Sequence, residues 1–183
     1  MITKQIPHPN SIVVVGGSND LDKPGGKVLK NLIDGKFQGK LYVSNPKSDE
    51  IQGIRSYRDL NDMPDADLAI IAIAAKYTLP TIEFLTKNKK TKAFIILSAG
   101  FSEESHEGKV LEDKIVETIN KVNGSLIGPN CVGILTPQHH SVFTYPIPKL
   151  DNHGCDFVSG SGATACFIME AGIPQGLKFA NVY

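Results

Sequence analysis

The chain of 183 residues has no tryptophan, only three cysteines and no excess of charge of either sign. Cys131, Cys155 and Cys166 are unevenly spaced, which excludes a disulfide framework and the ligand spacing of a zinc site. Their small number favours a reducing, cytoplasmic setting. Lysine plus arginine and aspartate plus glutamate each total 19, so the charge balance predicts no nucleic-acid partner. Apolar runs of membrane-spanning length and a signal-peptide core are also missing, so we expect no membrane partner.

Short apolar runs alternate with helical patterns up to about residue 130. The runs predict strands at 12–15, 41–43, 68–73, 93–97 and 125–127. Helices are expected from Pro24 or Gly25 to Gly35, over 78–87 and over 110–122, and a short strand or helical turn within 51–60. Four apolar residues in a row are typical of a strand that is buried on both faces. The alternation predicts an α/β, Rossmann-like parallel sheet with helices on both faces.

Prolines and an aperiodic composition interrupt this pattern between residues 136 and 154. A strand at 156–158, a turn at 159–162, a helix at 163–171 and a strand from 178 follow. Such a segment is too short to bury a core by itself. We therefore expect residues 1–145 to form one domain and residues 146–183 to be the start of a second domain whose remainder is missing.

The first strand ends in Gly16, Gly17 and Ser18, and a helix follows. A glycine turn between a strand and a helix N-terminus lets the backbone approach a phosphate group closely. The turn lacks the dinucleotide fingerprint, because Ser18 and Leu21 occupy two of its glycine positions. Lys47, at the end of the second strand, favours a ribose that carries an extra phosphate, as in coenzyme A or NADP. The alternative is that the glycines only make a tight turn and that Lys47 is a solvated surface charge.

The other strands also end in loops rich in small residues, at 44–47, 74–76, 98–101 and 128–131. Ligands of open α/β sheets bind beyond the carboxyl ends of the strands. A long ligand could therefore lie against several of these loops, although small residues are common wherever strands end in turns.

Five motifs carry a resemblance that covers nearly the whole chain. They are Val-Val-Gly-Gly-Ser at 14–18, Asn-Pro-Lys at 45–47, Ile-Ile-Leu-Ser-Ala-Gly-Phe at 95–101, Gly-Pro-Asn-Cys-Val-Gly at 128–133 and Val-Ser-Gly-Ser-Gly-Ala at 158–163. In these motifs and their order the chain resembles the CoA-binding region of NDP-forming acyl-CoA synthetases, the superfamily that includes the α subunit of succinyl-CoA synthetase.

The resemblance implies coenzyme A as the cofactor and a binding role for thirteen residues along its length. These would be Gly16, Gly17 and Ser18 at the pyrophosphate, Asn45, Pro46 and Lys47 at the adenosine and its 3′-phosphate, Ala74, Ser98, Ala99, Gly100 and Phe101 along the pantetheine arm, and Asn130 and Cys131 at the thiol end. Ser161, Gly162 and Ala163 would bind a phosphate or a phosphorylated group at the start of a helix. Gly160 departs from the family pattern, which usually has a larger polar residue there.

The family reaction converts acyl-CoA, phosphate and ADP to a carboxylic acid, CoA and ATP, reversibly and through a phosphohistidine. The resemblance places that histidine in the second domain, downstream of residue 183, and it implies a separate ATP-grasp part. The chain would then be part of a ligase whose partners are CoA or acyl-CoA and the remainder of the synthetase, on the same or another chain, in an oligomer or alone. We expect no catalytic residue and no metal site in this chain, and a flavodoxin-like second domain.

None of the five histidines lies in a matching motif; they are His8, His106, His139, His140 and His153. The adjacent pair at 139–140 is expected in a surface loop, and His106 is expected to be solvated at the start of a helix. Glu103, Glu104 and Glu107 are expected in the acidic first turn of that helix. Cys131 could act near the CoA thiol, but the favoured interpretation is a buried small hydrophobic residue.

Two other functions remain open from the sequence. One is a non-catalytic or regulatory CoA-binding module, for example fused to a protein acetyltransferase. The other is an NADP-dependent reductase, which the broken fingerprint and the lack of a hydride-transfer constellation disfavour.

Overall fold

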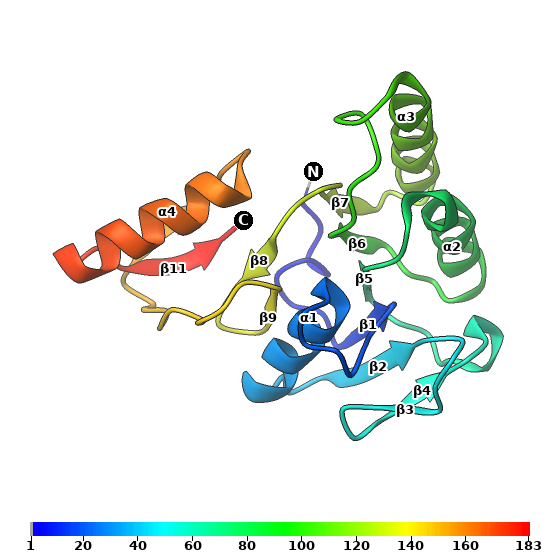
Figure 1. The fold of residues 1–183 in the computed structure, drawn as a ribbon, viewed down its shortest axis with the longest axis horizontal. Helices are drawn as coiled ribbons and strands as arrows, with labels where there is room; N and C mark the ends of the chain where they lie inside the picture. Colours follow the sequence, from blue (N-terminus) through cyan, green and yellow to red (C-terminus); the bar gives the residue numbers. More distant parts are fainter. Residues whose placement is uncertain (1) are drawn as a thin grey trace.

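A seven-stranded sheet forms the centre of the computed structural model, which describes residues 2–183 (Figure 1). Its strand order is β3-β4-β2-β1-β5-β6-β7. Neighbouring strands run parallel, except for the antiparallel pair β3–β4 at one edge. The strands are β1 (Ser11–Val15), β2 (Lys40–Ser44), β3 (Glu50–Ile51), β4 (Ile54–Tyr57), β5 (Leu68–Ile71), β6 (Ala93–Ile96) and β7 (Ser125–Ile127).

Helices cover both faces of this sheet. Helix α1 (Pro24–Asp34) packs on the face that includes Val14, whereas α2 (Ala75–Asn88) and α3 (His106–Lys121) pack on the face that includes Val13. A 3₁₀ turn, η1 (Leu60–Asp62), leads into β5. Because each central strand is apolar on both faces, both layers of helices bury it. The predicted Rossmann-like α/β fold is confirmed.

A second, four-stranded sheet follows, with the order β10-β11-β8-β9. Its strands are β8 (Gly133–Leu135), β9 (His140–Val142), β10 (Cys155–Phe157) and β11 (Phe179–Val182), with α4 (Gly162–Gly172) and the 3₁₀ turn η2 (Ile173–Gln175) between β10 and β11. The unit β10–α4–β11 is a parallel strand–helix–strand. In Figure 1 it stands beside the main sheet, and the β8–β9 hairpin lies between the two.

The β8–β9 hairpin was not expected from the sequence, which shows no periodicity there. Each of its strands has only three residues, too few to display an alternating pattern. Leu135 and Val142 of the hairpin join Phe179 and Val182 in a separate small core. The strand–helix–strand unit thus buries its apolar side chains against residues that precede position 145. The predicted boundary at 145 remains a prediction, and this core crosses it.

The expectation that His139 lies in a surface loop is wrong. Its side chain is 2% exposed, and its Nε2 and Nδ1 atoms are 2.8 Å from the Ile6 carbonyl oxygen and 2.7 Å from the Ser141 hydroxyl. Burial lowers the pKa of His139 to about 4, so the ring is neutral at physiological pH. His140, beside it, is half-buried. The hairpin turn folds His139 inward, an orientation that no local pattern predicts.

Only one of the three glutamates expected in the first turn of α3 lies there. Ser105 caps α3 by accepting the Gly108 N–H, so Glu107 lies in the first turn, whereas Glu103 and Glu104 precede the helix. His106 opens α3 and is exposed, as expected. No described helix is long and apolar enough to cross a bilayer.

Candidate functional site

The glycine turn at the carboxyl end of β1 brings the start of α1 into backbone contact with the strand. Gly16 has a φ of +87°, and its N–H donates to the Ser44 carbonyl at 2.8 Å. A Cβ on Gly25 would lie 2.1 Å from the Gly16 carbonyl oxygen. Only glycine at position 25 permits this approach, which places the first turn of α1 directly above the end of β1.

Three successive backbone donors are available at this turn. Within residues 2–183, the N–H groups of Gly17, Ser18 and Asn19 have no protein acceptor. Lys23, the N-cap of α1, provides no side-chain acceptor for that helix either. Unpaired N–H groups beside an uncapped helix N-terminus form a site that suits an anion. The turn therefore fits a pyrophosphate group.

The Asn45-Pro46-Lys47 motif lies next to the glycine turn. The Asn45 side chain donates to the Gly17 carbonyl at 2.8 Å and accepts the Lys47 N–H at 2.9 Å. The Lys47 side chain is exposed and forms no ion pair with the residues that the structure describes. The structure thus brings the first two motifs together and leaves the Lys47 ammonium group free to meet a phosphate.

Hydrogen bonds also connect the ends of β5, β6 and β7. The Ser98 hydroxyl donates to the Ile73 carbonyl at 2.5 Å, and the Asn130 N–H donates to the Ser98 carbonyl at 3.0 Å. Ala74 is exposed at the start of α2, which has no side-chain cap. These contacts align the loops at 74, 98–101 and 128–131 along one edge of the sheet, as the sequence predicts.

Phe101 cannot line that edge with its side chain. The ring is fully buried in the core on the α3 side of the sheet. Its N–H, with that of Gly100, donates to the Glu103 carboxylate at 3.3 and 2.7 Å respectively. Desolvation alone would raise the pKa of Glu103, but the backbone hydrogen bonds together outweigh it and lower that pKa. Phe101 is 0% exposed as a whole residue, and its carbonyl accepts the N–H groups of Glu104 and Ser105, so neither its side chain nor its backbone is exposed to a ligand.

A cavity of about 420 Å³ joins the two units of the chain. Asn130 and Cys131 line it from the loop after β7, Gly162 lines it from the start of α4, and Glu103 and Tyr183 complete the wall. A Cβ on Gly162 would lie 2.5 Å from a methyl carbon of Val132, so the helix start packs closely on the 128–133 loop. The structure thus brings the predicted thiol end of the CoA site and the predicted phosphate-binding turn into one cavity.

Helix α4 starts with a side-chain cap. The Ser161 hydroxyl accepts the Thr164 N–H at 3.3 Å, and the Gly162 and Ala163 N–H groups have no acceptor within residues 2–183. Ser161 and Ala163 are exposed, and a Cβ on Gly160 would meet no atom within 4 Å. The turn therefore leaves room for a larger residue at position 160.

The Cys131 residue is half-buried, and its thiol is held by the neighbouring strand. Its Sγ donates to the Ile96 carbonyl at 3.3 Å, and burial raises the pKa of the thiol to about 11. The thiol is therefore protonated at neutral pH and is a poor nucleophile.

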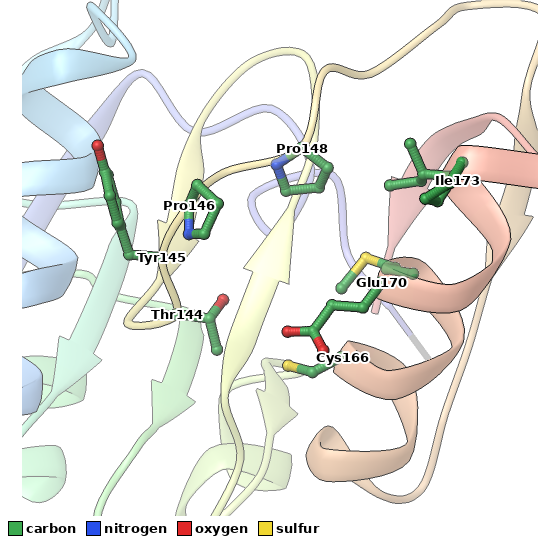
Figure 2. A pocket seen from close by; sticks show the side chains of 9 residues that line it. Thr144, Tyr145, Pro146, Pro148, Cys166, Glu170 and Ile173 are labelled. Carbon is green, nitrogen blue, oxygen red and sulfur yellow. The ribbon is translucent and has the colours of Figure 1, made fainter.

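A separate apolar groove of about 280 Å³ lies between the segment 144–148 and α4. Figure 2 shows Thr144, Pro146 and Pro148 on one side of it and Cys166 and Glu170 on the other. None of the predicted site residues lines this groove. Among residues 2–183, no three His, Cys, Asp or Glu side chains gather as a metal site would require.

Sequence reasoning missed Gln52, whose side chain contacts the glycine turn. The Gln52-Gly53 pair has φ values of +50° and +79° and connects β3 to β4. A Gln-Gly pair between Ile51 and Ile54 is a weak hairpin signal, and the weak periodicity of residues 51–60 hid it.

Comparison with known proteins supports this description of the fold. The family model for the CoA binding domain matches residues 10–137. An ADP-forming acetate–CoA ligase II subunit alpha from Pyrococcus furiosus is 35% identical over 176 residues, which are 95% of this chain and 38% of that protein. An ADP-forming 4-hydroxybutyrate–CoA ligase from Nitrosopumilus maritimus is 32% identical over 187 residues, which are the whole of this chain and 26% of that protein.

The solved structure of a dinucleotide-forming acetyl-coenzyme A synthetase 1 from Ca. Korarchaeum cryptofilum has the same fold. It matches 98% of this chain and 39% of its own length, with a TM-score of 0.88 and 28% identity. The chain thus spans well under half the length of each of these three relatives. The predicted resemblance to the CoA-binding region of NDP-forming acyl-CoA synthetases is confirmed, and the chain belongs to the CoA binding domain family.

Proposed function

We propose that this chain is the CoA-binding part of an ADP-forming acyl-CoA synthetase, which interconverts acyl-CoA, phosphate and ADP with a carboxylic acid, CoA and ATP. One observation carries the proposal: the loop at Asn130 and Cys131 and the turn at Gly162 share a cavity. The thioester end of CoA and a phosphate would meet there, as the attack of phosphate on an acyl-CoA requires.

Different residues would bind different parts of CoA and the phosphate. The N–H groups of Gly17, Ser18 and Asn19 bind the pyrophosphate, and Lys47 binds the 3′-phosphate with a charge-assisted contact. The arm of CoA follows the edge formed by Ser98 and the 128–131 loop into the cavity. The free N–H groups of Gly162 and Ala163 stabilise the incoming phosphate. Coenzyme A itself supplies the thiol that carries the acyl group.

Further parts of the synthetase would cover α4. Phe167 in α4 is 71% exposed and Val158, just before the helix, is 74% exposed. Ile168 and Ala165 make other sides of the helix apolar as well. A helix that is apolar on all sides is buried in a larger assembly. The remainder of a second domain, carrying the phosphohistidine, and an ATP-grasp part are the partners we propose, in a cytoplasmic enzyme.

Ligand binding to the purified chain tests the proposal. CoA is expected to raise the Tm and NADP is not, because stabilisation grows with the ratio of ligand concentration to Kd. Replacement of Lys47→Glu is expected to reduce the shift with CoA, while Lys36→Glu, on an exposed turn after α1, serves as the charge-matched control. If neither CoA nor desulfo-CoA at millimolar concentration shifts the Tm, the proposal is wrong.

A further inference from the structure

The Gln52 side chain joins two points of the glycine loop that are eight residues apart. Its Nε2 donates to the Ser18 carbonyl at 2.7 Å and to the Gly26 carbonyl at 2.9 Å. The Gln52 backbone N–H also donates to the Asn19 side chain at 2.7 Å. A single residue of the β3–β4 hairpin therefore holds the start of the loop, at Ser18, against the first turn of α1, at Gly26.

Apart from Gln52, the restraints at the tip of the loop are local: Ser18 and Asp20 accept N–H groups from residues two or three positions further on, and Asp20 pairs with Lys23. Gly16 is bonded to Ser44 and Gly17 to Asn45, but both bonds lie at the beginning of the loop. The tip around Leu21 and Asp22 is exposed. Closing a flexible loop costs conformational entropy, and a ligand that must itself order the loop binds more weakly. Gln52 orders the loop in the free protein, so a ligand does not have to order it on binding.

The contact with the Ser18 carbonyl also fixes the orientation of the peptide bond between Ser18 and Asn19. In a trans peptide the carbonyl and the following N–H point to opposite sides, so the Ser18 carbonyl that faces Gln52 turns the Asn19 N–H away from the hairpin. That N–H is one of the three donors without a protein acceptor within residues 2–183. Gln52 thus orients part of the anion site without belonging to it.

Gln52 is poorly suited to a purely stabilising role. Its φ of +50° lies in the left-handed region, where glycine or asparagine is favoured. Its Oε1 atom is buried without a hydrogen-bond partner among residues 2–183, which costs stability. The amide nitrogen, with its two acceptors, is the part of the side chain that the loop uses.

We propose that Gln52 is a positioning residue for the pyrophosphate of CoA, acting through the carbonyl groups of Ser18 and Gly26. The inference rests on the proposed function, since it takes the glycine loop as the pyrophosphate site. A carboxylate at position 52 cannot donate to two carbonyl oxygens, and it would repel both them and the ligand.

Isothermal titration of CoA and dephospho-CoA tests this role. Gln52→Met removes both side-chain hydrogen bonds at similar volume, and it is expected to weaken both ligands by about tenfold, because both contain the pyrophosphate. Gln52→Glu is expected to weaken both further. Lys47→Ala is expected to affect CoA more than dephospho-CoA, which lacks the 3′-phosphate. Gln38→Met is the matched control, because the exposed Gln38 side chain donates only to the nearby Lys36 carbonyl.

The Tm of the free protein separates positioning from folding. Gln52→Met is expected to stay within about 2 °C of wild type, because the lost hydrogen bonds are offset by removal of the unpaired oxygen. Gln52→Gly, which suits the positive φ, is a second variant that keeps the turn and loses the side chain. An unchanged Kd in both variants, or a loss that Gln38→Met shares, overturns the inference. Failure of the wild-type protein to bind either ligand would instead overturn the proposed function.

Discussion

The ring of His139 hydrogen-bonds to the carbonyl of Ile6, 133 residues earlier in the chain, at 2.8 Å. The carbonyl accepts, so Nε2 carries the proton, and Nδ1 accepts the Ser141 hydroxyl at 2.7 Å. The contact holds the N-terminal segment and the β8–β9 hairpin together. Burial disfavours the charged form of this ring, because the site is shielded from water.

The stability of the fold is therefore expected to decrease in acid. The folded-state pKa of His139 is about 4, below its ordinary value of 6.5, so the unfolded chain takes up the proton first as the pH falls. The contribution of neutral His139 to the free energy of unfolding is complete above pH 6.5. It is lost progressively as the pH falls from 6.5 to about 4, and the total loss is about 3 kcal/mol. Urea unfolding at pH 7.5, 6 and 5 measures this loss.

Gln at position 139 can donate to Ile6 and accept from Ser141 without titrating. A His139→Gln variant is expected to be less sensitive to pH between 6.5 and 5 than wild type. If the two proteins have the same pH dependence, the loss of stability in acid is due to groups other than His139.

Asn31 is expected to stabilise the contact between α1 and the hairpin. Its buried side chain donates to the carbonyls of Val142 and Thr144 at 2.7 and 3.0 Å. Asn31→Ala leaves both without this donor and is expected to cost about 1–3 kcal/mol, measured by urea unfolding. Asn88→Ala is the control, because Asn88 is exposed and donates only to Phe84 within its own helix. Equal losses in the two variants would contradict this role of Asn31.

The close approach at the glycine turn predicts a sharp contrast between two alanine substitutions. Gly25→Ala places a Cβ 2.1 Å from the Gly16 carbonyl, so α1 must shift, at a cost of about 1–3 kcal/mol and with weaker CoA binding. Gly160→Ala meets no atom within 4 Å and is expected to leave the Tm unchanged. Differential scanning calorimetry, with and without CoA, compares them. Equal Tm values would mean that the approach at Gly25 is not required.

Alkylation should discriminate between the cysteines. Burial raises the pKa of Cys131 to about 11, whereas Cys155 is exposed, so iodoacetamide at pH 8 is expected to modify Cys155 well before Cys131. Mass spectrometry of peptides from samples taken at successive times shows which cysteine is alkylated first. A Cys131 that reacts as fast as Cys155 in the folded protein would contradict the buried, protonated thiol.

Local sequence was sufficient for five of the seven strands of the main sheet, β1, β2, β5, β6 and β7, and for the loops at their carboxyl ends. Val13 and Val14 belong to a four-residue apolar run, which is typical of a strand covered on both faces, and glycines after such a run indicate close backbone approach. The edge shared by Ser98 and Asn130 was also predictable, because the carboxyl ends of parallel strands meet. The roles of the individual site residues remain predictions.

Long-range contacts were not predictable, because no local pattern encodes them. The sequence by itself determined the alternation of strands and helices, the glycine turn and the family motifs, all of which depend on neighbours along the chain. Only the tertiary structure decided that His139 is buried, that Gln52 holds the glycine loop, and that Leu135 shares a core with Phe179. Each of these depends on segments that are distant in sequence, and packing, rather than local propensity, brings them together.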